Sequence, residues 1–175
     1  MAGSVSAAAY ATLLDRVLHD CERSVQDLNV EELNHLPPDT NSIGFDVWHA
    51  VRTIDNIVFF VFDREQPVWL TGGFDERFGL PRVQQGTGME PEEAHALRFP
   101  EPAAFLEYVQ AVRAACVPRV EAMTDAYLAE SVLLRPWGER PRLQHIGQLM
   151  IVHAMGHVGR ASFARTLLGH SDLGF

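Results

Sequence analysis

The chain has 175 residues, a formal net charge of −9 and only two cysteines, and this length is enough for one domain that buries its own core. The acidic balance excludes the usual basic surface of a nucleic-acid-binding protein. No apolar run reaches the roughly 18 residues of a membrane span, and the N-terminus lacks the features of a secretory signal.

Apolar residues recur every three or four positions over four long segments, a spacing typical of amphipathic helices. These predicted helices cover residues 6–28, 43–64, 102–128 and 143–168. Pro118 predicts a kink or an interruption in the third helix, and Gly169 is a favoured residue just beyond the end of the fourth. We therefore expect residues 1–175 to form a single all-α domain, a four-helix bundle.

The segment between the second and third predicted helices, residues 66–100, is a long irregular excursion rich in glycine and proline. A connection of this length is more often functional than idle. Its large apolar residues, such as Trp69 and Phe78, argue against disorder, so we expect it to pack over the mouth of the bundle. Pro91 and two glutamates after it predict a short helix. After the third helix, the chain is expected to be extended over 131–135 and to turn over 136–141.

The last predicted helix carries His153 and His157 in an apolar run. Residues four apart lie on one face of a helix, so two imidazoles there can converge on a divalent metal, as in the zincin helix. Ala154 stands where a zincin has its general-base glutamate. His49, in the second helix, is the best candidate for a third ligand, because three histidines and a water form an open metal site. The competing interpretation is that these histidines are core residues that donate to backbone carbonyls.

Charged residues close to these histidines are candidates for a supporting role. Asp55 could accept a ring N–H from a metal-bound histidine, although Arg52 and Asp55 are also spaced as an ordinary surface ion pair. Arg160 follows His157 by three residues, and its guanidinium could hold a carboxylate in the pocket or lie on a solvated face. We expect both cysteines to be buried packing residues rather than nucleophiles.

Residues 41–49, 76–81 and 86–88, together with the closing histidine pair, resemble the DinB/YfiT-like superfamily over nearly the whole chain. The resemblance implies an up-down-down-up four-helix bundle, often a homodimer. It also implies one divalent metal, zinc or nickel, held by His49, His153 and His157. Family members of known chemistry are enzymes that use the thiols mycothiol or bacillithiol on small molecules.

Three functions from different classes follow. The first is a transferase that adds a low-molecular-weight thiol to an electrophilic small molecule through a metal-activated thiolate. The second is a hydrolase in which the same metal activates water. The third is a non-catalytic, stress-related bundle that binds a metal or a ligand. The two cysteines and the absence of a secretory signal predict a cytoplasmic location for any of them.

Overall fold

The computed structural model describes residues 4–174 and buries the apolar faces of its long helices in a common core. The elements in chain order are α1 (Val5–Val25), α2 (Val30–Leu33), α3 (Ile43–Asn56), the π-helix η1 (Ile57–Val61), α4 (Val68–Thr71), α5 (Phe74–Phe78), α6 (Pro91–Ala96), α7 (Pro102–Glu121), α8 (Asp125–Ala129), β1 (Ser131–Leu134), β2 (Gly138–Pro141), α9 (Arg142–His145), the π-helix η2 (Ile146–His153) and α10 (Ala154–Leu167).

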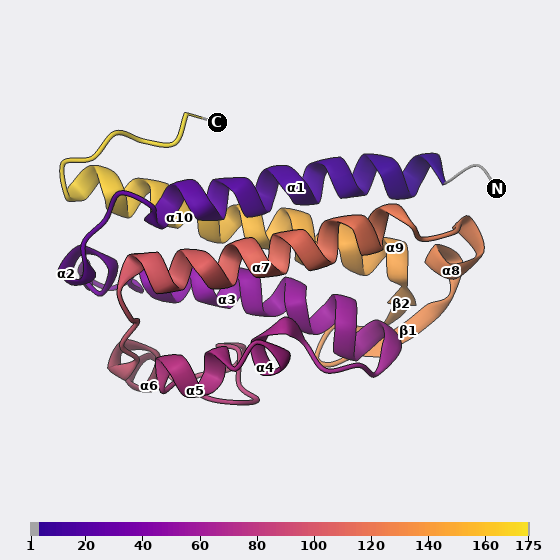
Figure 1. Ribbon diagram of the computed structural model, residues 1–175, viewed down its shortest axis with the longest axis horizontal. Helices are drawn as coiled ribbons and strands as arrows, with labels where there is room; N and C mark the ends of the chain where they lie inside the picture. Colours follow the sequence, from indigo (N-terminus) through magenta and orange to yellow (C-terminus); the bar gives the residue numbers. More distant parts are fainter. Residues whose placement is uncertain (1–3, 175) are drawn as a thin grey trace.

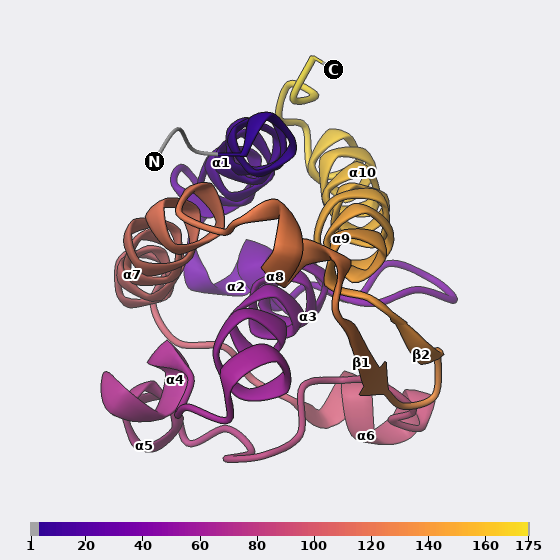
Figure 2. The same ribbon diagram turned by 90° about the vertical axis from the view of Figure 1, so that its right-hand side faces the viewer.

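Four of these helices make the bundle. In Figure 1, α1 and α10 run in one direction and α3 and α7 run in the other, which is the predicted up-down-down-up topology. Figure 2 views the molecule along the bundle and shows the four helices around a shared centre. The most extensive contacts join α1 to α7 and α3 to α10. The predicted all-α four-helix bundle is thus confirmed, and the pairing of α3 with α10 brings the two predicted histidine segments face to face.

Local sequence signals set several helix ends. The side chains of Ser4 and Ser42 accept hydrogen bonds from backbone N–H groups in the first turns of α1 and α3, as N-cap residues do. Gly169 follows the end of α10 with a φ of 90°, as predicted. The end of the third helix was predicted too late: α7 runs through Pro118 to Glu121. The hydroxyl of Thr124 then caps α8 as a separate helix.

Two π-helical segments extend the bundle helices. The first, η1, continues α3, and the second, η2, leads into α10 and ends at His153. Such segments are rare in proteins, but those that occur are often found at functional sites. They change the number of residues per turn, so the side-chain register along these helices differs from that of a regular α-helix.

The excursion over residues 66–100 is more ordered than expected, because it contains α4, α5 and α6. Its aromatic residues Trp69, Phe74 and Phe78 are buried in the common core, so the expectation that it packs onto the bundle is confirmed. The segment predicted as a turn, 136–141, instead supplies β2, which pairs antiparallel with β1 so that Ser131 lies opposite Pro141. The extended segment before it was predicted correctly.

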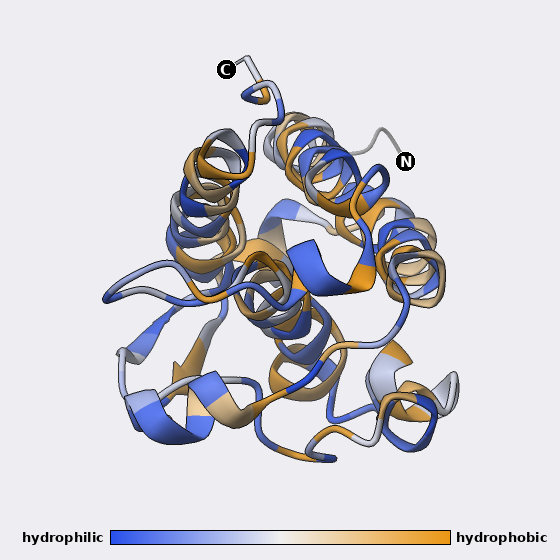
Figure 3. Cartoon of the chain, turned by 90° about the vertical axis from the view of Figure 1, so that its left-hand side faces the viewer, coloured by the Kyte–Doolittle hydropathy of each residue, from blue (hydrophilic) through white to orange (hydrophobic). Residues whose placement is uncertain are grey.

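Hydropathy follows this packing. Figure 3 shows hydrophobic residues on the sides of the long helices that face one another and hydrophilic residues on much of the outside. Within residues 4–174, none of the helices combines the length and the apolar character needed to cross a bilayer.

Candidate metal centre

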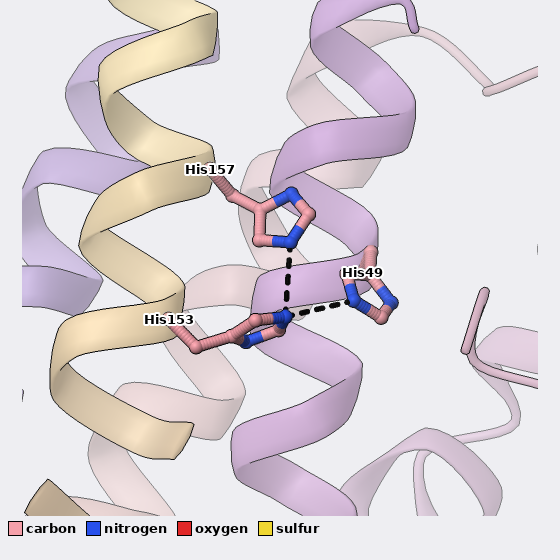
Figure 4. Close-up of side chains that lie close together, drawn as sticks. All are labelled: His49, His153 and His157. Carbon is pink, nitrogen blue, oxygen red and sulfur yellow. Dashed lines mark hydrogen bonds between the residues drawn. The ribbon is translucent and has the colours of Figure 1, made fainter. Parts of the chain in front are cut away.

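The three predicted histidines meet between α3 and the η2–α10 helix, with their rings directed toward one another (Figure 4). The Nε2 atom of His153 lies 3.3 Å from Nε2 of His49 and 3.1 Å from Nε2 of His157. His49 and His157 are buried, and His153 is partly buried. The ring nitrogens therefore converge on one point at the edge of the core.

The spacing of these nitrogens fits a metal ion. Zinc–imidazole bonds are 2.0–2.1 Å long, so two ligand nitrogens of a tetrahedral site are separated by about 3.3–3.4 Å. The observed separations of 3.3 Å and 3.1 Å are close to this range.

Hydrogen bonds at the far side of two rings orient them for this role. Nδ1 of His157 lies 2.7 Å from Oδ1 of Asp46, and Nδ1 of His49 contacts the backbone carbonyl oxygen of Gln85. Both of these oxygens are acceptors, so each Nδ1 is placed to donate to them and each Nε2 is directed at the centre of the cluster. Lone pairs that face one another repel unless a cation or a proton lies between them. The donor set therefore fits a divalent metal.

The environment also keeps the imidazoles uncharged. Burial lowers the pKa of His49 to about 4, and burial together with the neighbouring His157 lowers the pKa of His153. Both rings are then neutral at pH 7, which is the form that binds metals.

The excursion contributes backbone to this site at Gly86. Its φ is +95°, and a Cβ at this position would lie 2.8 Å from Nδ1 of His49 and 3.0 Å from the Phe45 ring. A side chain is therefore excluded both by the backbone conformation and by the close approach to the histidine. This glycine allows the Gln85 carbonyl to reach His49.

The residue that supports the histidines is Asp46, which the sequence analysis missed. It is 1% exposed, and its Oδ1 accepts hydrogen bonds from His157 and from Nε and Nη2 of Arg160, the latter two at 3.1 Å. At 100° per residue, Asp46 lies about 60° from His49 around the helix axis. Its spacing of three residues from His49 was a usable signal.

The predicted supporting role of Asp55 is wrong. By the same arithmetic it lies about 120° around the helix axis from His49, twice as far as Asp46. Its carboxylate accepts hydrogen bonds from the backbone N–H groups of Val68 and Trp69, both at 2.8 Å, and from the Tyr108 hydroxyl at 3.1 Å. Asp55 therefore anchors the start of α4 to the bundle and does not contact the histidines.

The Arg52 side chain is also directed at α4 rather than at the histidines. Arg52 and Asp55 are 1% and 0% exposed, so the alternative of a surface ion pair is also wrong. The Arg52 guanidinium stacks over the Trp69 ring, and its nearest nitrogen is 3.8 Å from the Asp55 carboxylate. This buried pair belongs to the core between α3 and α4.

Comparisons with known proteins agree with this geometry. The model of the DinB superfamily matches residues 13–161. The chain belongs to the DinB superfamily. A crystal structure described as the conserved protein of locus from Enterococcus faecalis has the same fold, with a TM-score of 0.81, 23% sequence identity, and coverage of 96% of this chain and 99% of that one. A search of curated proteins gave no significant match. Family and histidine cluster together fit a metal-dependent DinB-like protein.

A pocket of about 670 Å³ opens beside the histidines of this DinB superfamily member. Its apolar lining includes Phe45, Met89 and Trp137, and Arg160 lies at its wall, where the sequence analysis had placed it as one alternative. Trp137 comes from the turn of the β-hairpin, which the sequence pattern had not shown to lie near the histidines. The volume is within the range of small-molecule sites, roughly 300–1,000 Å³.

The cysteines of this DinB superfamily member take no part in the pocket. Cys21 and Cys116 are free thiols, both fully buried, and burial raises the pKa of each above its usual range. They are therefore protonated packing residues, as predicted, and a reactive thiol would have to come from outside the protein.

We expect Asp46→Asn to weaken zinc binding about 10- to 100-fold, the usual cost of losing a carboxylate that holds a ligand histidine. The amide keeps the shape but loses the charge that fixes the His157 tautomer. Competition with a chromophoric chelator measures the affinity. Asp75→Asn is the matched control. Asp75, in α5, is also a buried carboxylate, and it pairs with Arg82 in the loop after α5. Equal zinc affinity in the Asp46 variant and the wild type would show that Asp46 does not support the site.

Proposed function

We propose that this protein is a divalent-metal-dependent enzyme that transfers or adds a low-molecular-weight thiol, mycothiol or bacillithiol, to an electrophilic small molecule. The observation that carries the proposal is the convergence of three imidazoles at the wall of a small-molecule pocket. A zinc or nickel ion bound there supplies Lewis acidity that lowers the pKa of a thiol to near neutrality.

The chain's own residues have defined tasks in this proposal. His49, His153 and His157 hold the ion, and Asp46 with the Gln85 carbonyl fixes two of the rings. The Asp46 carboxylate is 1% exposed and already accepts three hydrogen bonds from His157 and Arg160, so it is poorly placed to take a proton from a substrate. A thiol that ionises at the metal needs no such base.

The second candidate is a hydrolase, and one observation favours it. Asp39 and His95 also line the pocket, and either is a chemically suitable general base for the attack of water. A hydrolase would turn over amides or esters without any thiol.

A thiol-consumption assay tests the proposal. Zinc-loaded protein is mixed with bacillithiol or mycothiol and a panel of small electrophiles, and loss of free thiol is followed. We expect saturable, metal-dependent consumption that His49→Ala abolishes together with metal binding. Turnover of amides or esters in thiol-free buffer would instead select the hydrolase. Tight metal binding with neither activity would select the non-catalytic bundle.

We also propose that the protein is a cytoplasmic homodimer. The outward face of α10 and its preceding turn expose Val152, Phe163 and Leu167, which are 70%, 65% and 56% accessible. Phe163 and Leu167, one helical turn apart, form an exposed apolar pair of the kind found at interaction sites, and two reduced cysteines suit a reducing compartment. Sedimentation velocity measures the oligomeric state directly.

A further inference from the structure

We propose that Arg160 binds a carboxylate and that the pocket beside the histidines takes small carboxylic acids with an apolar body. The role of such an acid rests on the proposed function, in which the acid would be the electrophile that receives the thiol. The binding itself requires no thiol and can be measured separately.

Among the described residues, the geometry of Arg160 leaves Nη1 of its guanidinium free, while Nη2 contacts both Asp46 and the His157 ring. Nε and Nη2 both donate to Oδ1 of the buried Asp46, which fixes the plane of the group. Nη1 donates no hydrogen bond within residues 4–174, and the side chain is 49% accessible where it lines the pocket. An arginine held along one edge presents the rest of its fork to a second planar anion.

The same protein shows that one arginine can serve two carboxylates. Arg119 donates through Nη2 to Asp63 and through Nη1 to Glu65, at 2.6 Å and 2.8 Å. Arg160 uses Nη2 for Asp46 in the same way, and its Nη1 is the position that lacks the second partner. A ligand carboxylate would complete the arrangement that Arg119 makes with protein groups alone.

The charges of the pocket favour a monoanion. Among its described lining residues, Arg160 is the one arginine or lysine, and Asp39 contributes a charge of the opposite sign. A single guanidinium matches a single carboxylate, whereas a phosphate dianion usually meets a cluster of cations.

The position of Arg160 links this subsite to the metal centre. Its Nη2 lies 3.1 Å from Nε2 of His157, so an acid held by Arg160 lies next to the converging imidazoles. The remaining wall is apolar, with Phe45, Met89 and Trp137. The ligand that fits is a carboxylic acid whose body packs on these aromatic and thioether groups.

Isothermal titration calorimetry of zinc-loaded protein with trans-cinnamate and its uncharged amide, trans-cinnamamide, tests the proposal. We expect the wild type to bind the acid about ten-fold or more tightly than the amide, as a charge-assisted hydrogen bond provides. Arg160→Gln should reduce this preference to within about two-fold, and Arg160→Lys should lose most of it, because lysine lacks the second edge. Any binding of the carboxylate to zinc is common to wild type and variants, so their difference isolates Arg160.

Arg16→Gln is the matched control, because Arg16 is also half-exposed and donates to a buried aspartate, Asp20, but lies on α1. It should keep the full preference for the acid, and zinc content is measured for every variant. An Arg160→Gln protein that keeps zinc and prefers the acid as strongly as the wild type does, or a wild type without a preference, would overturn the proposal. Either result would leave thiol transfer intact, because no thiol is present in this experiment.

Discussion

Replacement of His153 by alanine should cost more zinc affinity than the roughly 10- to 100-fold expected when only a supporting partner of a ligand is lost. His153 is central to the cluster, because its Nε2 lies within 3.3 Å of Nε2 of both His49 and His157. Without it, two imidazoles remain, and two protein ligands rarely hold zinc tightly. Chelator competition and elemental analysis give the affinity and the stoichiometry, which should be near one equivalent in the wild type.

His145→Ala is the matched control for this experiment. His145 is also a buried histidine near the start of the same helical segment, but its Nε2 lies 3.1 Å from the backbone carbonyl of Val132. This variant should keep its zinc. If both variants bind zinc as the wild type does, the histidines of the cluster are ordinary core residues. If both lose it, the loss reflects unfolding rather than removal of a ligand.

Asp55→Ala should lower the free energy of unfolding by about 3–5 kcal/mol, the usual cost of breaking a buried ion pair. The substitution leaves the Arg52 guanidinium buried without its counter-charge. It also removes the acceptor for the backbone N–H groups of Val68 and Trp69 and for the Tyr108 hydroxyl. Urea denaturation monitored by circular dichroism measures the change.

The exposed Asp172, near the C-terminus, provides the control, since Asp172→Ala should change stability by less than about 0.5 kcal/mol. Below the unfolding transition, the Asp55 variant should still bind one equivalent of zinc, because the Asp55 carboxylate bonds to α4 and Tyr108 rather than to the histidines. If the Asp55→Ala protein instead has wild-type stability but binds no zinc, Asp55 supports the metal site and the assignment above is wrong.

The contrast between Asp46 and Asp55 shows how much of the candidate metal site can be predicted from the sequence. The histidines could be predicted, because their spacing and the family resemblance both indicate them. The choice of aspartate failed because Asp55 was chosen for its spacing from Arg52, whereas its angular position relative to His49 decides, and Asp46 is closer to His49 both in sequence and around the helix. Once α3 pairs with α10, the aspartate one turn before His49 faces His157.

Other parts of the site depend on tertiary structure that no local pattern reveals. The four helices follow from apolar periodicity, but the position of Trp137 requires the hairpin to fold back beside the bundle. The contact of the Gln85 carbonyl with His49 requires the backbone conformation of Gly86. The π-helical segments also escape prediction, since apolar residues like those of η1 and η2 are equally compatible with an α-helix.

The most direct test of the metal centre is a crystal structure of zinc-loaded protein with anomalous data collected at the zinc edge. We expect one strong anomalous peak about 2.0–2.1 Å from each Nε2 of His49, His153 and His157, with Nδ1 of His157 still bound to Asp46. No peak at the three histidines under zinc saturation, or zinc held by other residues, would contradict the account.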